Sequence, residues 1–168
     1  MVSNRAKPSL PDRGYQVVYL GLSNRVLAVL LNEAKERDYR SVFAEVGAEN
    51  DDSFRAQSRV NPRESSAAIN ELSRAFRAST ACMDPRWIPR EFSYMRSLPG
   101  GVEQEPPMDY PPPVVNTTSN KRYQRIPASM LLALQPGTSL RVFDGCFTIR
   151  DDSKARKVEI PPRADWKQ

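Results

Sequence analysis

The sequence predicts an α+β fold, in which helices come first along the chain and short antiparallel strands follow. Two segments in the first half, residues 24–40 and 66–82, repeat apolar side chains at the spacing of one helix face. The second half instead carries short alternating or β-branched segments, separated by proline and glycine turn signals. Because the order runs from helices to strands, we expect early helices that pack against an antiparallel sheet.

The first expected helix, residues 24–40, has both a capping residue and an apolar face. Ser23 precedes it, and a serine hydroxyl can accept a hydrogen bond from an otherwise unpaired amide of the first turn. The charged residues from Glu33 to Arg40 are expected to face water. The core-facing side chains share one face of the helix and are Val26, Leu27, Leu30, Leu31 and Ala34.

The second expected helix covers residues 66–82 and is capped by Ser65 or Ser66. It ends before Asp84-Pro85, because the residue before a proline is pushed out of the helical region. Its apolar stripe is formed by Ile69, Leu72, Ala75, Phe76, Thr80 and Cys82.

Four segments of the second half predict strands or short extended turns. Residues 91–98 predict a strand that ends in the turn Pro99-Gly100-Gly101. Residues 129–134 predict a buried strand or one short apolar turn. In residues 139–143, outward Arg141 alternates with inward Leu140 and Val142. Residues 156–160 predict another alternating strand.

Three further segments complete the expected arrangement. Residues 15–20 predict a short strand or an extended lead-in. Residues 44–64 are polar and lack a clear period, so we expect a loop there. After the turn at Asp144-Gly145, residues 146–149 are expected to return as a hairpin arm.

Composition limits the classes of site that this protein can form. A chain of 168 residues fits one domain, which we place at residues 15–162 between a flexible tail at 1–14 and a frayed end at 163–168. The chain contains no histidine, so neither a Ser-His-Asp triad nor an imidazole metal site can form. Its two cysteines predict buried free thiols and not a disulfide framework.

The charge and hydropathy of the chain indicate where it acts. No secretory signal and no apolar run long enough for a membrane span is found, so we expect an intracellular protein, cytoplasmic or nuclear, without a membrane partner. The net charge of +5 predicts a weak, non-specific attraction to nucleic acids. Residues 154–157 form a basic cluster that is either a phosphate contact or a solvated turn.

Three stretches together carry a resemblance to a known family. They are YMRSLPGGVEQEPPMDY from residue 94, IPASMLLALQPGTSLRVFDGC at 126–146, and ARKVEIPP at 155–162. In this order and spacing the chain resembles the non-haem iron, 2-oxoglutarate-dependent dioxygenases, in particular a divergent type of eukaryotic microbes. The resemblance implies a jelly-roll-like sheet, here incomplete, on which the two helices pack.

The resemblance also implies an iron site, and this sequence departs from it. Members of the family hold ferrous iron with two histidines and one carboxylate, and they use 2-oxoglutarate as cosubstrate. The position of the first histidine is occupied by Pro107, so Asp109 is the only remaining metal-ligand position. The pattern is lost at Arg163, before a distal histidine. We therefore expect a truncated, degenerate relative without oxidoreductase activity, with no cofactor bound and no catalytic residue.

Other interpretations of the same residues stay open. Glu103 and Glu105 near Asp109 predict either a loose oxygen-rich cluster or a solvated loop. A longer gene product could supply the distal histidine. An incomplete sheet would expose an edge, which predicts marginal stability or a protein partner that covers that edge. The alternative function is a small basic interaction module that binds a protein or nucleic acid through its cationic surface or the proline-rich residues 107–115.

Overall fold

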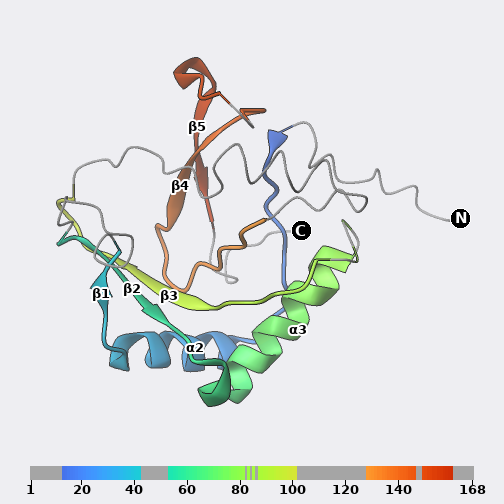
Figure 1. Cartoon of the computed structure of the whole chain (residues 1–168), viewed down its shortest axis with the longest axis vertical. Helices are drawn as coiled ribbons and strands as arrows, with labels where there is room; N and C mark the ends of the chain where they lie inside the picture. Colours follow the sequence, from blue (N-terminus) through green and yellow to red (C-terminus); the bar gives the residue numbers. More distant parts are fainter. Residues whose placement is uncertain are drawn as a thin grey trace, which may run out of the picture.

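The computed structural model describes residues 13–42, 53–81, 83, 85, 87–101, 128–146 and 149–160. Helices and antiparallel strands are combined in an α+β fold, as the sequence predicts (Figure 1). The elements in chain order are α2 (Asn24–Glu36), β1 (Arg40–Ser41), β2 (Arg55–Arg59), the 3-10 helix η1 (Pro62–Glu64), α3 (Ala67–Ala81), β3 (Ser93–Ser97), β4 (Ser139–Phe143), the 3-10 helix η2 (Asp152–Lys154) and β5 (Ala155–Glu159).

Helix α2 begins where the sequence predicts and ends earlier. The Ser23 hydroxyl accepts a hydrogen bond from the Val26 amide at 3.2 Å, which confirms the predicted cap. The helix stops at Glu36 and does not continue to residue 40, because Arg37 already has an extended backbone. This early end brings the Tyr39 hydroxyl to the carbonyl oxygen of Ala34, to which it donates a hydrogen bond of 2.8 Å. A side chain thus satisfies one of the last helical carbonyls.

Helix α3 closely follows its prediction. Of the two candidate caps, Ser66 is the one that accepts from the Ile69 amide, at 3.1 Å. The Thr80 hydroxyl, buried near the other end, donates to the Phe76 carbonyl oxygen at 2.9 Å. The buried side chains of the helix are Ala68, Ile69, Leu72, Phe76 and Thr80.

The loop that the sequence predicts at residues 44–64 is wrong for Arg55–Arg59, which form strand β2. It is the central strand of a three-stranded antiparallel sheet in the order β1-β2-β3. Its residues, RAQSR, contain a single apolar side chain, so no hydrophobic alternation marks them as a strand. Pairing with β3 along all five of its residues is what forms the strand.

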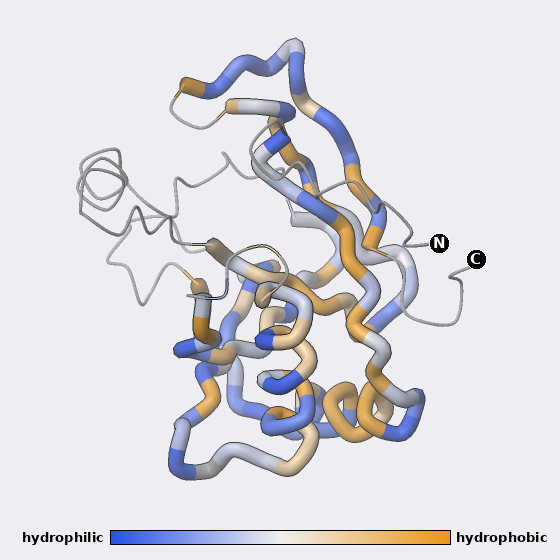
Figure 2. The backbone as a smooth tube through the Cα atoms, turned by 90° about the vertical axis from the view of Figure 1, so that its right-hand side faces the viewer, coloured by the Kyte–Doolittle hydropathy of each residue, from blue (hydrophilic) through white to orange (hydrophobic). Residues whose placement is uncertain are grey.

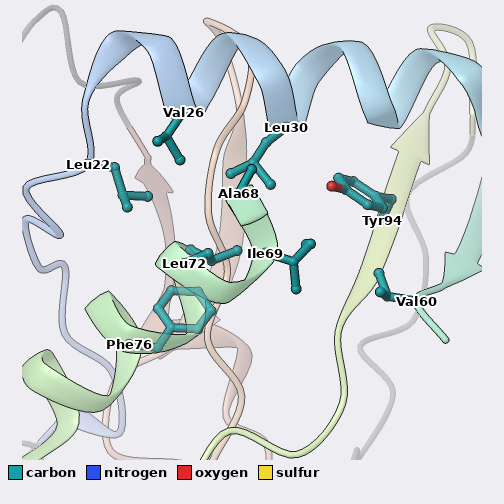
Figure 3. Close-up of a cluster of buried hydrophobic side chains, with 9 residues drawn as sticks. All are labelled: Leu22, Val26, Leu30, Val60, Ala68, Ile69, Leu72, Phe76 and Tyr94. Carbon is teal, nitrogen blue, oxygen red and sulfur yellow. The ribbon is translucent and has the colours of Figure 1, made fainter. Parts of the chain in front are cut away.

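The hydrophobic core lies between the two helices and the inner face of this sheet (Figure 3). Leu30 of α2 is its most buried side chain, with 1% of its surface exposed. Phe76 of α3 stacks on Phe92, just before β3, with ring centroids 6.1 Å apart. The nine buried members are Leu22, Val26, Leu30, Val60, Ala68, Ile69, Leu72, Phe76 and Tyr94.

Residues 128–134 pack against this core without forming a strand. Ala133 is buried, and Met130, Leu132 and Leu134 are partly buried against the core cluster. The predicted burial is therefore present only in part, since Leu131 leaves 49% of its surface exposed, and the predicted strand or turn is an irregular segment. A turn follows at Gln135-Pro136-Gly137, where Gly137 adopts a positive φ of 78°.

Strands β4 and β5 form a separate two-stranded sheet, the β4–β5 hairpin, which stands away from the helices (Figures 1 and 2). Strand β4 pairs with β5 from Ser139↔Glu159 to Phe143↔Ala155. The expectation that residues 146–149 return as the hairpin arm is therefore wrong, because β5 occupies that position. The described strands form two antiparallel sheets.

Several predictions fall outside the described residues, namely those for residues 1–12, Cys82, Asp109, the proline-rich residues 107–115 and residues 161–168. Residues 15–20 have no regular secondary structure, which agrees with an extended lead-in. Among the described helices, none has the length and apolar character needed to cross a membrane.

Candidate functional site

The outer face of the three-stranded sheet is rich in arginine. In an antiparallel sheet, residues directly opposite each other point to the same side, and neighbours along a strand point to opposite sides. Ser58 lies opposite Tyr94, and the Tyr94 ring is buried in the core, so these two residues define the inner face. The other face, which we call the arginine face, carries Arg40, Arg55, Gln57, Arg59, Ser93, Met95 and Ser97.

The strands contribute no carboxylate to the arginine face. The sequences of β1, β2 and β3 are RS, RAQSR and SYMRS, which contain four arginines and no aspartate or glutamate. Three of these arginines, Arg40, Arg55 and Arg59, lie on the arginine face, and Arg96 lies on the inner side. The strands themselves therefore supply no acidic partner for these arginines.

The register also brings these cations close together. Arg40 lies opposite Gln57, so Arg55 and Arg59 are its diagonal neighbours across the strand pair. Diagonal neighbours in an antiparallel pair are about 7–8 Å apart, which is within the screening length of physiological salt, ~8 Å. The register therefore places the three arginines next to one another on this face.

Much of the arginine face is exposed to solvent, and two of its polar side chains are hydrogen-bonded to each other. Met95, in its middle, leaves 60% of its surface exposed, and Arg40 and Arg59 are exposed as well. The Gln57 side-chain amide donates to the Ser93 hydroxyl at 2.8 Å across β2 and β3. Arg55 and Arg59 also interact within the chain. An exposed, arginine-rich sheet face of this kind suits a partner with repeated negative charges.

The inner side of the sheet holds its charged groups in fixed contacts. The Arg96 guanidinium lies over the Tyr39 ring, 4.5 Å from the centroid. The Arg37 guanidinium lies 4.9 Å from the centroid of the Tyr94 ring, and the Tyr94 hydroxyl donates to a Glu33 carboxylate oxygen at 2.7 Å. Burial and this hydrogen bond raise the pKa of Tyr94 well above its ordinary value. We assign this cluster a structural role, because it ties α2 to the sheet.

The β4–β5 hairpin carries the second concentration of charge. The Arg141 and Arg150 guanidinium groups both lie over the Phe143 ring, 5.1 and 5.2 Å from its centroid. Asp152 bridges the two arginines, at 3.4 Å from Arg141 and 2.7 Å from Arg150. One carboxylate thus pairs with both guanidinium groups. The basic cluster predicted at residues 154–157 lies on this hairpin, and its Lys154 and Arg156 pair with Asp151 and Asp144.

The residues of the metal site that the resemblance implies lie mostly outside the part of the chain that the structure describes. Asp109, with Pro107, Glu103 and Glu105, lies outside the described residues. Among the residues that are described, no three histidine, cysteine, aspartate or glutamate side chains gather in a way that could hold a metal ion. Cys146 is a half-buried free thiol whose sulfur lies 3.7 Å from the Asp144 carbonyl oxygen.

Sequence reasoning identified the basic cluster of the hairpin but missed the arginine face. The signal was present as four arginines spread over three short polar segments, two of which were not predicted as strands. Only the strand register shows that three of them share one face. Comparison with known proteins adds no assignment, since no family model, curated protein or solved structure matches the chain.

Proposed function

We propose that this protein is a non-catalytic binding module that holds a polyanionic partner against its arginine face. The observation that carries the proposal is the placement of Arg40, Arg55 and Arg59 on one open face of strands that contain no carboxylate. The overall charge of +5 adds a long-range attraction of the same sign. Such a surface recognises repeated phosphates, sulfates or carboxylates by charge, and it requires no catalytic group.

A charge-matched pair of variants tests this proposal. Arg40→Ala removes a cation from the arginine face, and Arg96→Ala removes the same charge from the inner side of the same sheet. We expect wild type and Arg96→Ala to elute from a heparin column at similar salt concentrations, and Arg40→Ala to elute at a clearly lower one. Equal shifts for the two variants would show that only net charge matters and would contradict a binding face. The absence of any salt-dependent retention of the wild type would also contradict a binding face.

A second candidate function follows the dioxygenase resemblance. It is supported by the positions of three strands relative to the stretches that carry the resemblance. β4 and β5 lie within the second and third stretches, and β3 begins one residue before the first and continues into it. On this proposal the protein is a degenerate relative that keeps part of the scaffold without the iron chemistry. It is compatible with a binding role, because a scaffold that has lost its metal ligands can still present a surface.

Iron titration tests the second candidate. We expect neither stoichiometric ferrous binding nor oxidation of 2-oxoglutarate, since the chain has no histidine and a single carboxylate cannot fix the metal. Tight binding of one ferrous ion together with turnover of 2-oxoglutarate would refute it.

An additional protein partner that covers a sheet edge stays a proposal. Within the described residues the edges of the three-stranded sheet are β1 and β3.

A further inference from the structure

Strand β3 forms one edge of the three-stranded sheet over its whole length (Figure 1). It pairs with β2 at every residue from Ser93 to Ser97, and within the described part of the chain no strand pairs with its other side. Residues 128–134 pack against the same core, but no backbone hydrogen bond joins them to β3. An edge of this kind presents backbone groups with which a further strand can pair.

Two hydrogen bonds at the ends of the β2–β3 pair define which backbone groups point to this edge. The Leu98 amide donates to the Phe54 carbonyl oxygen at 2.8 Å, and the Val60 amide donates to the Phe92 carbonyl oxygen at 2.9 Å. Hydrogen-bonded and non-hydrogen-bonded residue pairs alternate along an antiparallel ladder. Every second residue of β3 therefore points its backbone groups away from β2, and these residues are Ser93, Met95 and Ser97.

The edge of β3 lacks the features that protect other sheet edges from pairing. Its sequence, SYMRS, contains no proline and no lysine, and its central residue is Met95. The one charged side chain, Arg96, lies over the ring of Tyr39 beside β1 and so leans away from the edge. By contrast, β1 has only two residues, and β4 and β5 are centred on Arg141 and Lys157. Among the described edges, β3 is therefore the one best suited to strand addition.

The two faces of the sheet determine which side chains an added strand requires. Tyr94 is 7% exposed on the inner face, so a partner residue opposite it should be apolar. On the outer face, Ser93 lies opposite Arg59. Ser97 lies opposite Arg55 in the same way. An outward side chain of the added strand thus extends the arginine face, where a carboxylate is the favourable group. The edge fits a strand in which apolar and acidic residues alternate.

Charge distinguishes an acidic partner from a second copy of this chain. A second copy carries the same net charge of +5, and its β3 strand contains one arginine and no carboxylate. Two such copies repel each other, whereas an acidic polypeptide is attracted. The surface is therefore complementary to an acidic protein and not to this chain itself.

We propose that the edge of β3 binds an extended segment of an acidic partner protein, which joins the three-stranded sheet as a fourth, antiparallel strand. Backbone hydrogen bonds to Ser93, Met95 and Ser97 supply affinity, and the alternation of side chains supplies specificity. The inference rests on the proposed function for the sign of the partner's charge. It adds to that function the class of partner and the way in which it binds.

Calorimetric titration with an end-capped peptide of about nine residues, in which valine and glutamate alternate, tests the proposal. In the added strand, glutamates lie opposite Ser93, Met95 and Ser97 and exchange backbone hydrogen bonds with them. N-methylation of the glutamates should therefore weaken binding about tenfold or more. N-methylation of the valines is the matched control, because it blocks the other edge of the same peptide, and affinity should stay within about threefold.

Two variants at one position test the same contact from the side of the protein. Met95→Pro removes an N–H group that points to the edge and not to β2, a position at which a strand tolerates proline. We expect it to weaken peptide binding about tenfold, and Met95→Ala, which keeps this N–H group, to bind within about threefold of the wild type. Where Met95→Pro disturbs folding, the N-methylated peptides test the contact on the unaltered protein.

The outcomes separate this inference from the proposed function. Equal affinity for the two N-methylated peptides would overturn strand addition. So would the absence of peptide binding by a wild-type protein that heparin still retains, and the proposed function would then stand. Loss of both activities would overturn both. Binding of an oligothymidylate in place of the peptide, unaffected by Met95→Pro, would identify a nucleic acid on the arginine face and would likewise overturn the inference.

Discussion

Tyr94 connects the three-stranded sheet to α2 through both parts of its side chain. Its ring is 7% exposed and belongs to the core, while its hydroxyl donates to Glu33 on α2 (Figure 3). Tyr39 makes a comparable but neutral contact, since its hydroxyl donates to the Ala34 carbonyl oxygen. The two tyrosines therefore allow the contribution of a charged acceptor to be compared with that of a neutral one.

We expect Tyr94→Phe to destabilise the protein by about 1–2 kcal/mol, because the half-buried Glu33 carboxylate loses its donor while the ring packing is kept. Tyr39→Phe should cost less, roughly 0.5–1 kcal/mol, since its acceptor is uncharged. Chemical denaturation of both variants and the wild type measures the difference. If Tyr94→Phe unfolded at the same denaturant concentration as the wild type, the contact with Glu33 would have no net stabilising effect.

The same contact predicts a dependence of stability on alkaline pH. Burial, the hydrogen bond to Glu33 and the negative charge of Glu33 raise the pKa of Tyr94 above 10, and Arg37 opposes this shift. The native state thus holds the phenolic proton more tightly than the unfolded chain does. The resulting stabilisation is complete below the unfolded pKa of about 10 and declines as the pH rises beyond it.

Between about pH 9 and pH 11, the free energy of unfolding of the wild type should therefore fall more steeply than that of Tyr94→Phe. Denaturation curves at a series of pH values, recorded for both proteins, measure the two slopes. Contributions from other titrating groups are common to both proteins and cancel in the comparison. Parallel slopes would mean that Tyr94 titrates alike in the folded and unfolded states.

At the scale of the elements, both helices depend on a serine cap. Ser66→Ala removes the acceptor of the Ile69 amide and should cost about 1 kcal/mol. Ser66→Asp keeps an acceptor at the same position and adds a negative charge near the helix N-terminus, so it should retain the stability of the wild type or exceed it. Thermal or chemical unfolding of the two variants measures this difference. Equal losses for alanine and aspartate would show that the side-chain oxygen of Ser66 does not act as a cap.

The elements also show what could be predicted from the sequence. The two helices were predicted correctly because each buries an apolar stripe at helical spacing, with Leu30 and Phe76 as examples. Strand β2 was missed because its stability depends on backbone pairing with its two neighbours, and RAQSR contains little apolar surface to show a period. The same physical reason explains why the arginine face was not predicted, since a strand register is required to define a face.

The choice of pairing partner explains the error at the β4–β5 hairpin. Strands β4 and β5 were each predicted from their alternating residues, but the partner of β4 was placed at residues 146–149. Local sequence does not specify which of two nearby segments completes a hairpin. The opposition of Arg141 and Lys157 across the hairpin follows only from the actual pairing.

Over the whole molecule, the hydrophobic core and the β4–β5 hairpin differ in how much they bury. The buried core cluster comes from α2, α3, β3 and residues adjoining the elements, and no residue of β4 or β5 is fully buried. Leu140 and Ile149 expose 36% and 80% of their surfaces. A two-stranded hairpin with few buried contacts is only marginally stable by itself in water.

We therefore expect the backbone amides of β4 and β5 to exchange with solvent through local opening, while those of α2 and α3 exchange only when the core unfolds. Hydrogen exchange under native conditions measures both sets. Leu30→Ala, which removes the most buried core side chain, should cost about 2–5 kcal/mol and speed exchange in the helices. Exchange in the hairpin should change little, because its opening does not require the core to unfold. Two results together would contradict this expectation: hairpin amides as well protected as those of α3 in the wild type, and a parallel loss of that protection in Leu30→Ala. Hairpin and core would then unfold as one cooperative unit.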